Sequence, residues 1–336
     1  MVLERRYHFL CAAAAVAQLV TLVLTWPLWS SRSTPPNLSL IDWLSSVPWG
    51  WPLAALCVLT VVRPRWGGPA FVVALILACL GDQMRLQPGV LSVAVLMVAP
   101  AFGETGRSIA RWHLCSLWLW AGLHKFLSRG WAAAGGGADF IVQAYGQPDW
   151  LWPAAIAVPL FEIALGASAL WPRLWKFTGV GAVALHVGIL VTLSPLFADW
   201  NSSVWPWNAA VAVAAPLLFL KQEEGAAFPS KAAIAAAAVL LAYPALFYAK
   251  AMDAYISHNL YSTNIATATV CPHSEYRCST EIFDTWDELN VPFPPEPRLF
   301  RQAFRERCNS EDELIIKGIK TWITGEPSEH RESCPG

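Results

Sequence analysis

The sequence predicts an all-α polytopic membrane protein with about nine transmembrane helices, followed by a small disulfide-bonded α+β domain outside the cytoplasm. Three observations predict this fold class: the composition, a series of apolar segments, and basic residues gathered in every second loop. Hydrophobic residues make up 55% of the chain and charged residues only 14%, against about 25% charged residues in a soluble domain. The mean hydropathy is +0.41. The net charge of -1 offers no basic surface, so we expect no nucleic-acid partner.

Nine apolar segments follow one another, and a helix that crosses the hydrocarbon core needs about 20 residues. They span approximately residues 9–29, 49–62, 68–86, 90–102, 111–129, 150–171, 175–197, 205–220 and 231–248. The first segment follows Arg5 and Arg6, and it is longer than the apolar region of about 7 to 15 residues in a signal peptide. We therefore expect it to remain as an uncleaved anchor in the lipid bilayer.

Basic residues alternate between loops in a way that predicts the topology. Every second loop holds two of them: Arg5 and Arg6, Arg63 and Arg65, Arg107 and Arg111, Arg173 and Lys176, and Lys221 and Lys231. By the positive-inside rule these loops are cytoplasmic, which places the N-terminus inside and the tail, residues 250–336, outside. The 19 Trp residues cluster at segment ends, where indole rings prefer the level of the lipid headgroups.

The cysteines fall into two groups that agree with this topology. Four lie in apolar segments, and Cys271, Cys278, Cys308 and Cys334 all lie in the tail. An oxidising compartment favours disulfides, so we expect two of them, with three pairings open. A metal site at Cys271, His273 and Cys278 is the alternative, but its spacing matches no standard zinc pattern. We therefore expect no metal.

The tail carries signals for three local structures. We expect the segment that begins at Tyr255 to leave the ninth helix along the membrane surface, and residues 266–270 to form a strand. Ser310 and Glu313 have the spacing of a capping box. They predict a helix whose apolar face consists of Ile315, Ile319, Trp322 and Ile323.

The third segment has an apolar run of only about 13 residues, so spanning the membrane requires the helix to continue through Leu86. This places Asp82, Gln83 and Arg85 in its outer third. Charges at that depth normally face protein or water. Two readings stay open: Asp82 and Arg85 form a pair that reaches outward to the headgroups, or the three residues form the polar wall of a cavity.

Glu162 and His186 lie midway along the sixth and seventh segments, each on a face with small residues. Small residues let membrane helices approach closely, so the two side chains are candidates for contact. One reading is a hydrogen bond between a neutral Glu162 and His186 that only fixes packing. The other is a proton relay or a substrate contact, the usual role of ionisable groups at that depth.

His124 and Lys125 end the fifth segment, on the outer side of the membrane. A lysine at this level can extend to the headgroups, whereas a buried one can act as a base. The glycine-rich loop 130–138 follows; it either caps a cavity or serves as a linker. Asn208, in the Trp-Pro-Trp-Asn turn that opens the eighth segment, is a further candidate for substrate binding.

Several motifs of the chain are recognisable together. They are Ala121–Lys125, Pro159–Gly166, Leu185–His186, Leu193–Asn208, Asp82–Pro88, Trp286–Pro292 and Pro295–Arg298. These motifs resemble the DoxX and MauE group of four-helix membrane proteins, mostly uncharacterised and bacterial, over roughly residues 70–310. The resemblance implies a DoxX-like four-helix bundle at residues 105–222 in a bacterial inner membrane. It also implies redox chemistry of sulfur, quinones or thiols.

A more remote similarity is to the HTTM module, the membrane part of vitamin K-dependent gamma-carboxylase. There a lysine on an Ala-Gly-x-x-Lys helix deprotonates reduced vitamin K, and Lys125 looks like the matching position. Three departures are present: His124 replaces a second lysine, Trp131 is displaced by one residue, and the large lumenal domain is absent. Carboxylation of proteins is therefore not expected, while a quinone-like ligand is.

The sequence thus divides into N-terminal helices at 1–104, the bundle at 105–222, a ninth helix at 231–249 and the tail. Our first hypothesis is a redox-linked protein that binds a quinone or another lipophilic small molecule, with Lys125 as proton acceptor and Glu162 and His186 as relay. The alternative is a non-catalytic accessory or assembly subunit whose tail binds a periplasmic or membrane protein partner.

Overall fold

In the computed structural model the chain is mostly helical, with a small sheet at its C-terminal end. The structure describes residues 4–220, 230–272, 278–319, 321–323, 325 and 327–335. The expectations for Lys221 and for His273 lie outside these residues. The long helices are α1 (Arg5–Leu24), α4 (Gly50–Val62), α5 (Pro64–Gly81), α6 (Pro88–Val98), α7 (Gly103–Leu127), α9 (Leu151–Ala169), α10 (Trp175–Leu193), α11 (Trp205–Phe219) and α12 (Lys231–Ala242).

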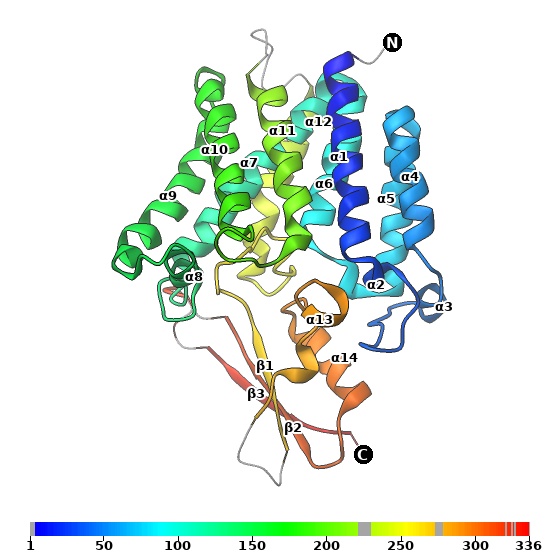
Figure 1. Ribbon diagram of the computed structural model, residues 1–336, viewed down its shortest axis with the longest axis vertical. Helices are drawn as coiled ribbons and strands as arrows, with labels where there is room; N and C mark the ends of the chain where they lie inside the picture. Colours follow the sequence, from blue (N-terminus) through cyan, green and yellow to red (C-terminus); the bar gives the residue numbers. More distant parts are fainter. Residues whose placement is uncertain are drawn as a thin grey trace.

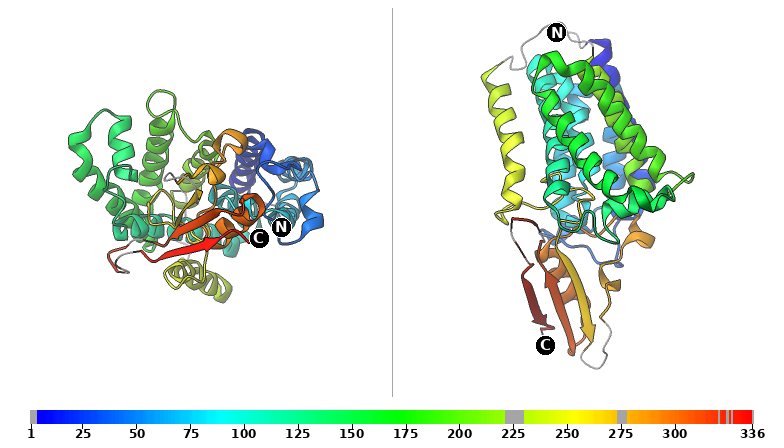
Figure 2. Two further views of the ribbon diagram at one scale, coloured as in Figure 1. Left: turned by 90° about the horizontal axis from the view of Figure 1, so that it is seen from below. Right: turned by 90° about the vertical axis from the view of Figure 1, so that its left-hand side faces the viewer.

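These helices stand side by side as one bundle, and the tail projects from one end of it (Figure 1). The N-terminus lies at the opposite end, which we call the N-terminal end; the other is the tail end. Short helices cover the tail end: α2 (Trp26–Trp29), α3 (Asp42–Ser45) and α8 (Gly137–Ala144). Figure 2 shows α12 at the edge of the bundle, where it packs against α7.

The described residues contain six helical stretches that are long and apolar enough to cross a membrane. They are Arg5–Leu24, Pro64–Gly81, Pro88–Leu127, Pro148–Ala169, Pro172–Leu193 and Ser202–Phe219. The 40-residue stretch Pro88–Leu127 contains both α6 and α7, and the apolar helices Gly50–Val62 and Lys231–Phe247 are shorter. Apolar side chains also cover the outside of the bundle, as Val73, Ile156 and Val180 do. A surface of this kind suits lipid, so the chain is an integral membrane protein.

The prediction that the third helix continues through Leu86 is wrong, because α5 ends at Gly81. Asp82 adopts an extended backbone conformation, and its carboxylate accepts hydrogen bonds from the backbone N–H groups of Leu38 and Met84, both at 3.1 Å. A helix would leave those donors without this acceptor. The chain therefore turns at Asp82 because its side chain satisfies local backbone groups better than a helical position does.

The tail consists of a three-stranded antiparallel sheet with α14 (Pro297–Arg307) packed against it. The strands are β1 (Thr267–Pro272), β2 (Asp312–Lys317) and β3 (Glu329–Ser333), in the order β1-β2-β3. The strand expected at 266–270 is confirmed by β1. The helix expected after Ser310 is wrong, because β2 occupies that stretch and buries Leu314 and Ile316 in alternation. Pairing with β1 on one side and β3 on the other outweighs the capping pattern.

Two disulfides stabilise the tail, as the sequence predicts, and the structure selects one of the three pairings. Cys271 bonds to Cys278, and Cys308 bonds to Cys334. The first bond joins the end of β1 to the chain that pairs back on it at Ser279. The second joins the end of α14 to the end of the sheet.

The segment between α12 and β1 enters the tail end of the bundle, contrary to the prediction that it follows the membrane surface. The backbone carbonyl of Ser257 lies 2.9 Å from Nε2 of His124, and the ring of His258 lies 5.5 Å from that of His113. Irregular backbone at this depth is tolerated only where protein buries it or where it lines a cavity. Both conditions hold here: the segment is largely buried, and it lines two cavities.

Candidate functional site

The candidate site begins with the close approach of α7 and α9. A Cβ atom added to Gly122 would lie 2.7 Å from the carbonyl oxygen of Pro159, and one added to Gly166 would lie 2.5 Å from the backbone N of Leu119. The small residues therefore allow the two backbones to touch. This contact sets the last turn of α7 opposite the middle of α9, and it brings Lys125 and Glu162 together.

Lys125 and Glu162 form an ion pair inside the bundle. The Lys125 ammonium donates to Oε1 and Oε2 of Glu162 at 2.9 and 2.8 Å, and to the carbonyl of Ala121 at 3.4 Å. Both side chains are more than nine-tenths buried. Lys125 thus does not extend to the headgroups, and the buried alternative holds. Taking two charges out of water is costly, and their mutual attraction offsets that cost only with good geometry, which this two-oxygen contact supplies.

This ion pair lies on the wall of a cavity of about 350 Å³, which we call the first cavity. Apolar residues of α8, α9 and α10 form most of the wall: Phe140, Ile141, Val158, Leu185 and Ile189. Trp200, Tyr261 and Thr263 close the tail end. A largely apolar cavity with a few polar groups, here the ion pair together with Thr192, Tyr261 and Thr263, is the ordinary form of a site for a small molecule.

The glycine-rich loop forms one side of the first cavity, through Trp131, Gly135, Gly136 and Gly137. The indole N–H of Trp131 donates to the carbonyl of Ala155 at 2.9 Å, which fixes the ring. The Lys125 ammonium lies 5.8 Å from the centre of that ring, within the range of a cation–π attraction. A Cβ atom on Gly137 would lie 2.2 Å from the same ring. The glycines therefore provide room for Trp131 beside the cavity, which goes beyond a linker role.

His186 has Trp118 and Asn208 as its hydrogen-bond partners instead of Glu162, and it is not among the described residues that line the first cavity. Its Nε2 accepts a hydrogen bond from the indole of Trp118 at 3.0 Å, so its proton lies on Nδ1. That Nδ1–H faces Oδ1 of Asn208 at 2.7 Å, and Asn208 in turn donates to the carbonyl of Val204. A ring that accepts at one nitrogen and donates at the other is neutral. His186 and Asn208 thus tie α10, α7 and α11 together.

His124 lies next to Lys125 but faces the other way. Its Nε2 donates to the carbonyl of Ser257, and its Nδ1 lies 2.8 Å from the hydroxyl of Tyr248. His124 therefore joins α7 to the tail. Of these two neighbouring residues, Lys125 lines the first cavity and His124 does not.

Asp82, Gln83 and Arg85 also lie elsewhere, at the tail end of α5. Asp82 and Arg85 are fully buried, so the outward-reaching pair is wrong. Arg85 donates to the carbonyls of Leu28 and Ala78, both at 2.9 Å, and Asp82 accepts from Arg32 at 2.5 Å. Gln83 contacts α14 of the tail and lines a separate apolar groove with α5, α6 and α7. These three residues fasten the tail end of the bundle and do not line the first cavity.

Sequence reasoning missed a second buried polar group, centred on His113 of α7. His113 lies 2.8 Å from the hydroxyl of Ser92 and faces His258 of the tail. His258 in turn lies 3.0 Å from the hydroxyl of Tyr243. The sequence offers one signal for this contact: the stretch Tyr255–Asn264 is polar and follows directly on the ninth segment.

The fold and the first cavity define an integral helical membrane protein with a buried ion pair beside an apolar cavity. In a comparison with known families, residues 103–204 match the family described as methylamine utilisation protein MauE. The matched region covers less than a third of the chain and contains α7, α9 and α10, including Lys125 and Glu162. It supports the expected relationship to MauE-like membrane proteins. No curated protein and no solved structure matches the chain significantly.

Proposed function

We propose that this protein binds a quinone-like, lipophilic small molecule in the first cavity and takes part in redox chemistry at a bacterial inner membrane. The observation that carries the proposal is the Lys125–Glu162 ion pair on the wall of an apolar cavity of about 350 Å³. A cavity of this size accepts the ring of such a molecule. Apolar helices on three sides suit a ligand that arrives from the bilayer.

The ion pair supplies proton chemistry without changing the net charge of the site. The Glu162 carboxylate accepts a proton from a ring hydroxyl, and the Lys125 ammonium then holds the oxygen that has lost it. One positive and one negative charge are present before and after this transfer, so no uncompensated charge enters a region of low dielectric constant. The Lys125 ammonium makes two short hydrogen bonds, both to Glu162. Its third contact, to the carbonyl of Ala121, is long at 3.4 Å and therefore weak, so a ligand oxygen can replace it.

We further propose that all nine long helices cross the membrane, with the N-terminus in the cytoplasm and the tail outside. Three observations support this topology. Turns of 3₁₀ helix lengthen two of the shorter helices, at Ala99–Phe102 and Tyr243–Phe247. Arg107 pairs with Glu4, so basic residues of one predicted cytoplasmic loop lie at the N-terminal end. The tail holds both disulfides and lies at the other end. Reporter fusions test the topology: a C-terminal alkaline phosphatase should be active, and activity of a cytoplasmic reporter there would contradict it.

The binding test uses the purified protein and the reduced, hydroquinone form of 2-methyl-1,4-naphthoquinone, kept under an inert atmosphere, with tryptophan fluorescence as the readout. Lys125→Met and Glu162→Gln should each weaken binding by about tenfold or more, since each removes a charge-assisted contact of about 1.5 to 3 kcal/mol. The exposed Lys176→Met and Glu288→Gln serve as matched controls and should bind as the wild type does. Equal binding by all four variants would refute the proposal. It would then favour the alternative, an accessory subunit whose polar membrane residues only fix packing.

A further inference from the structure

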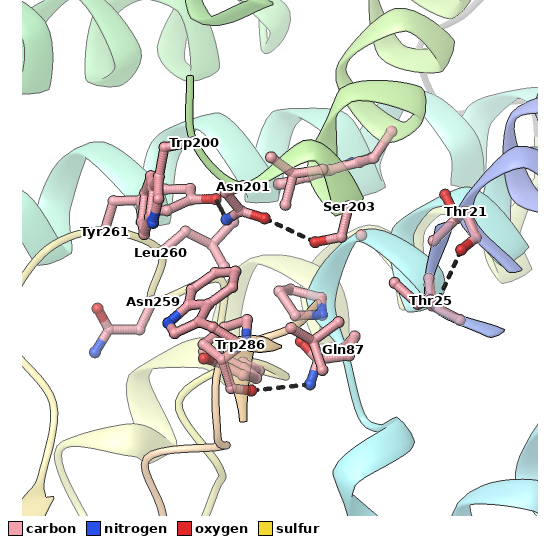
Figure 3. A pocket seen from close by; sticks show the side chains of 18 of the residues that line it. Thr21, Thr25, Gln87, Trp200, Asn201, Ser203, Asn259, Leu260, Tyr261 and Trp286 are labelled. Atoms are coloured by element: carbon pink, nitrogen blue, oxygen red, sulfur yellow. Dashed lines mark hydrogen bonds between the residues drawn. The ribbon is translucent and has the colours of Figure 1, made fainter. Parts of the chain in front are cut away.

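A second cavity of about 230 Å³ lies beside the first, where the tail meets the bundle. Figure 3 shows its wall: Thr21 and Thr25 come from α1 and the turn that follows it, Gln87 precedes α6, and Trp200, Asn201 and Ser203 precede α11. The buried tail segment provides Asn259, Leu260 and Tyr261, and α13 (Trp286–Leu289) provides Trp286. Trp200, Tyr261 and Thr263 line both cavities and thus form the partition between them.

The lining of the second cavity is aromatic and uncharged. Trp200 lies 5.3 Å from Trp286 and 5.9 Å from Tyr261, measured between ring centres. Trp207 and Tyr255 add two further aromatic rings. Among the described residues, no Asp, Glu, Lys, Arg or His side chain lines this cavity. A charged ligand would therefore be buried without a counter-charge, which is strongly unfavourable.

Most polar groups of the wall are occupied by one another. Asn201 donates to the hydroxyl of Tyr261 at 2.6 Å and accepts from Ser203 at 2.7 Å, and the Gln87 amide N–H₂ donates to Met84 and Pro292. These bonds hold the wall in one shape (Figure 3).

One buried polar atom of this lining has no partner in the described parts of the chain, the indole N–H of Trp207. Trp207 is 5% exposed, and a buried polar atom without a partner costs about 1 to 3 kcal/mol. An unpartnered N–H donor suits a ligand with a carbonyl oxygen.

The backbone around the partition is strained. Tyr261 and Thr263 have φ values of +53° and +55°, and Asn201 on the neighbouring loop has +51°. Positive φ is uncommon for a tyrosine or a threonine and costs about 1 to 3 kcal/mol at each position. Strain of this kind persists where it places side chains for a function, and here it places Tyr261 and Thr263 between the two cavities.

We propose that the second cavity is a separate binding site for an uncharged planar ring that carries hydrogen-bonding oxygens. The aromatic rings of the wall accept the ring faces, the lack of charged side chains among the described lining residues excludes ionic ligands, and the unpartnered N–H of Trp207 recognises an oxygen. The two cavities then hold two rings in tandem, on either side of Trp200 and Tyr261. The tandem arrangement rests on the proposed function of the first cavity, whereas the second site does not.

The test counts binding sites for 2-methyl-1,4-naphthoquinone on the intact protein by equilibrium dialysis. Trp207→Phe removes an N–H that has no partner among the described residues, together with part of the buried indole ring, so it breaks no hydrogen bond of the described fold. Trp205→Phe is its matched control, because the Trp205 indole N–H is also buried without a partner and Trp205 does not line the second cavity as described. Leu260→Trp fills the cavity, and Leu246→Trp places the same substitution on an exposed leucine.

The wild type should bind two equivalents. Trp207→Phe should weaken binding at the second cavity about threefold to tenfold, the effect of one neutral hydrogen bond. Leu260→Trp should abolish binding at that cavity, while both control variants should still bind two equivalents. Lys125→Met should leave the second site intact. If the wild type binds a single equivalent that is lost in Lys125→Met and unaffected by Trp207→Phe and Leu260→Trp, the second site is overturned and the proposed function stands. If the single equivalent is lost in Leu260→Trp and unaffected by Lys125→Met, the second site stands and the proposed function of the first cavity is overturned.

Discussion

Replacing Lys125 with methionine should destabilise the protein far more than replacing both members of its ion pair. In the single variant, the Glu162 carboxylate keeps its buried position and loses the cationic partner that it has among the described residues. Leaving one member of a buried pair uncompensated costs about 3 to 5 kcal/mol. Protonation of Glu162 limits this cost, so we expect a loss near the lower figure at neutral pH. Glu162→Leu should cost a similar amount, because it leaves the ammonium unpaired.

The double variant, Lys125→Met with Glu162→Leu, replaces two charges with two apolar groups of similar volume. Such replacements are often neutral or stabilising, so its stability should lie within about 1 kcal/mol of the wild type. The coupling energy of the double-mutant cycle is therefore about 5 kcal/mol or more. Unfolding in mixed micelles with increasing dodecyl sulfate measures the four stabilities. Lys176→Met, at an exposed position, is the control and should change stability little.

Two results would refute this reasoning. Single variants that each cost less than about 1 kcal/mol would show that the pair is not buried as a charged pair. Additive effects in the double variant would show that Lys125 and Glu162 do not interact. Either result would also remove the basis for proton exchange in the first cavity.

Three further predictions concern packing, pH and disulfides. Gly166→Ala should lower the unfolding temperature measurably, since its Cβ would lie 2.5 Å from backbone atoms of α7, whereas Gly188→Ala, with open space around it, should not. Burial, and then the nearby Asp253 carboxylate, raise the pKa of Glu296 to about 7 from 4.5. The folded protein therefore favours protonated Glu296, which contributes about 3 kcal/mol to the free energy of unfolding. This contribution is complete below pH 4.5 and is lost as the pH rises through about 7. Denaturation curves should show this loss in the wild type but not in Glu296→Gln. Removing the Cys308 disulfide, with a sequence separation of 26, should cost about 3.5 kcal/mol. Removing that of Cys271, with a separation of 7, should cost about 2.4 kcal/mol; hydrogen exchange of the tail measures both, and equal losses would contradict the loop-length argument.

The parts of the fold that follow from local composition were predictable. Apolar segments of suitable length identify α1, α9 and α10 within a few residues, and β1 lies where β-branched residues predict a strand. The end of α5 was not predictable from segment length, because it depends on a carboxylate at Asp82 that meets the backbone of Leu38, 44 residues away. Strand β2 depends in the same way on two partner strands that are distant in sequence.

The site shows the same division. Helix position and residue type singled out Lys125 and Glu162 as ionisable groups in the membrane, since apolar surroundings make each of them unusual. Their pairing depends on which faces of α7 and α9 meet, and Gly122 and Gly166 decide that contact. His186 has the same signal in sequence, yet packing directs it to Trp118 instead.

The sequence by itself determined that this chain is a multi-segment membrane protein with a disulfide-bonded tail, because hydropathy and composition are local properties that depend on solvent alone. Only the tertiary structure decided which buried groups meet, which cysteines pair, and that the stretch Ser257–Asn264 enters the bundle to line two cavities. Those outcomes depend on close contacts between distant segments, and the energy of such a contact depends on geometry that no single segment contains.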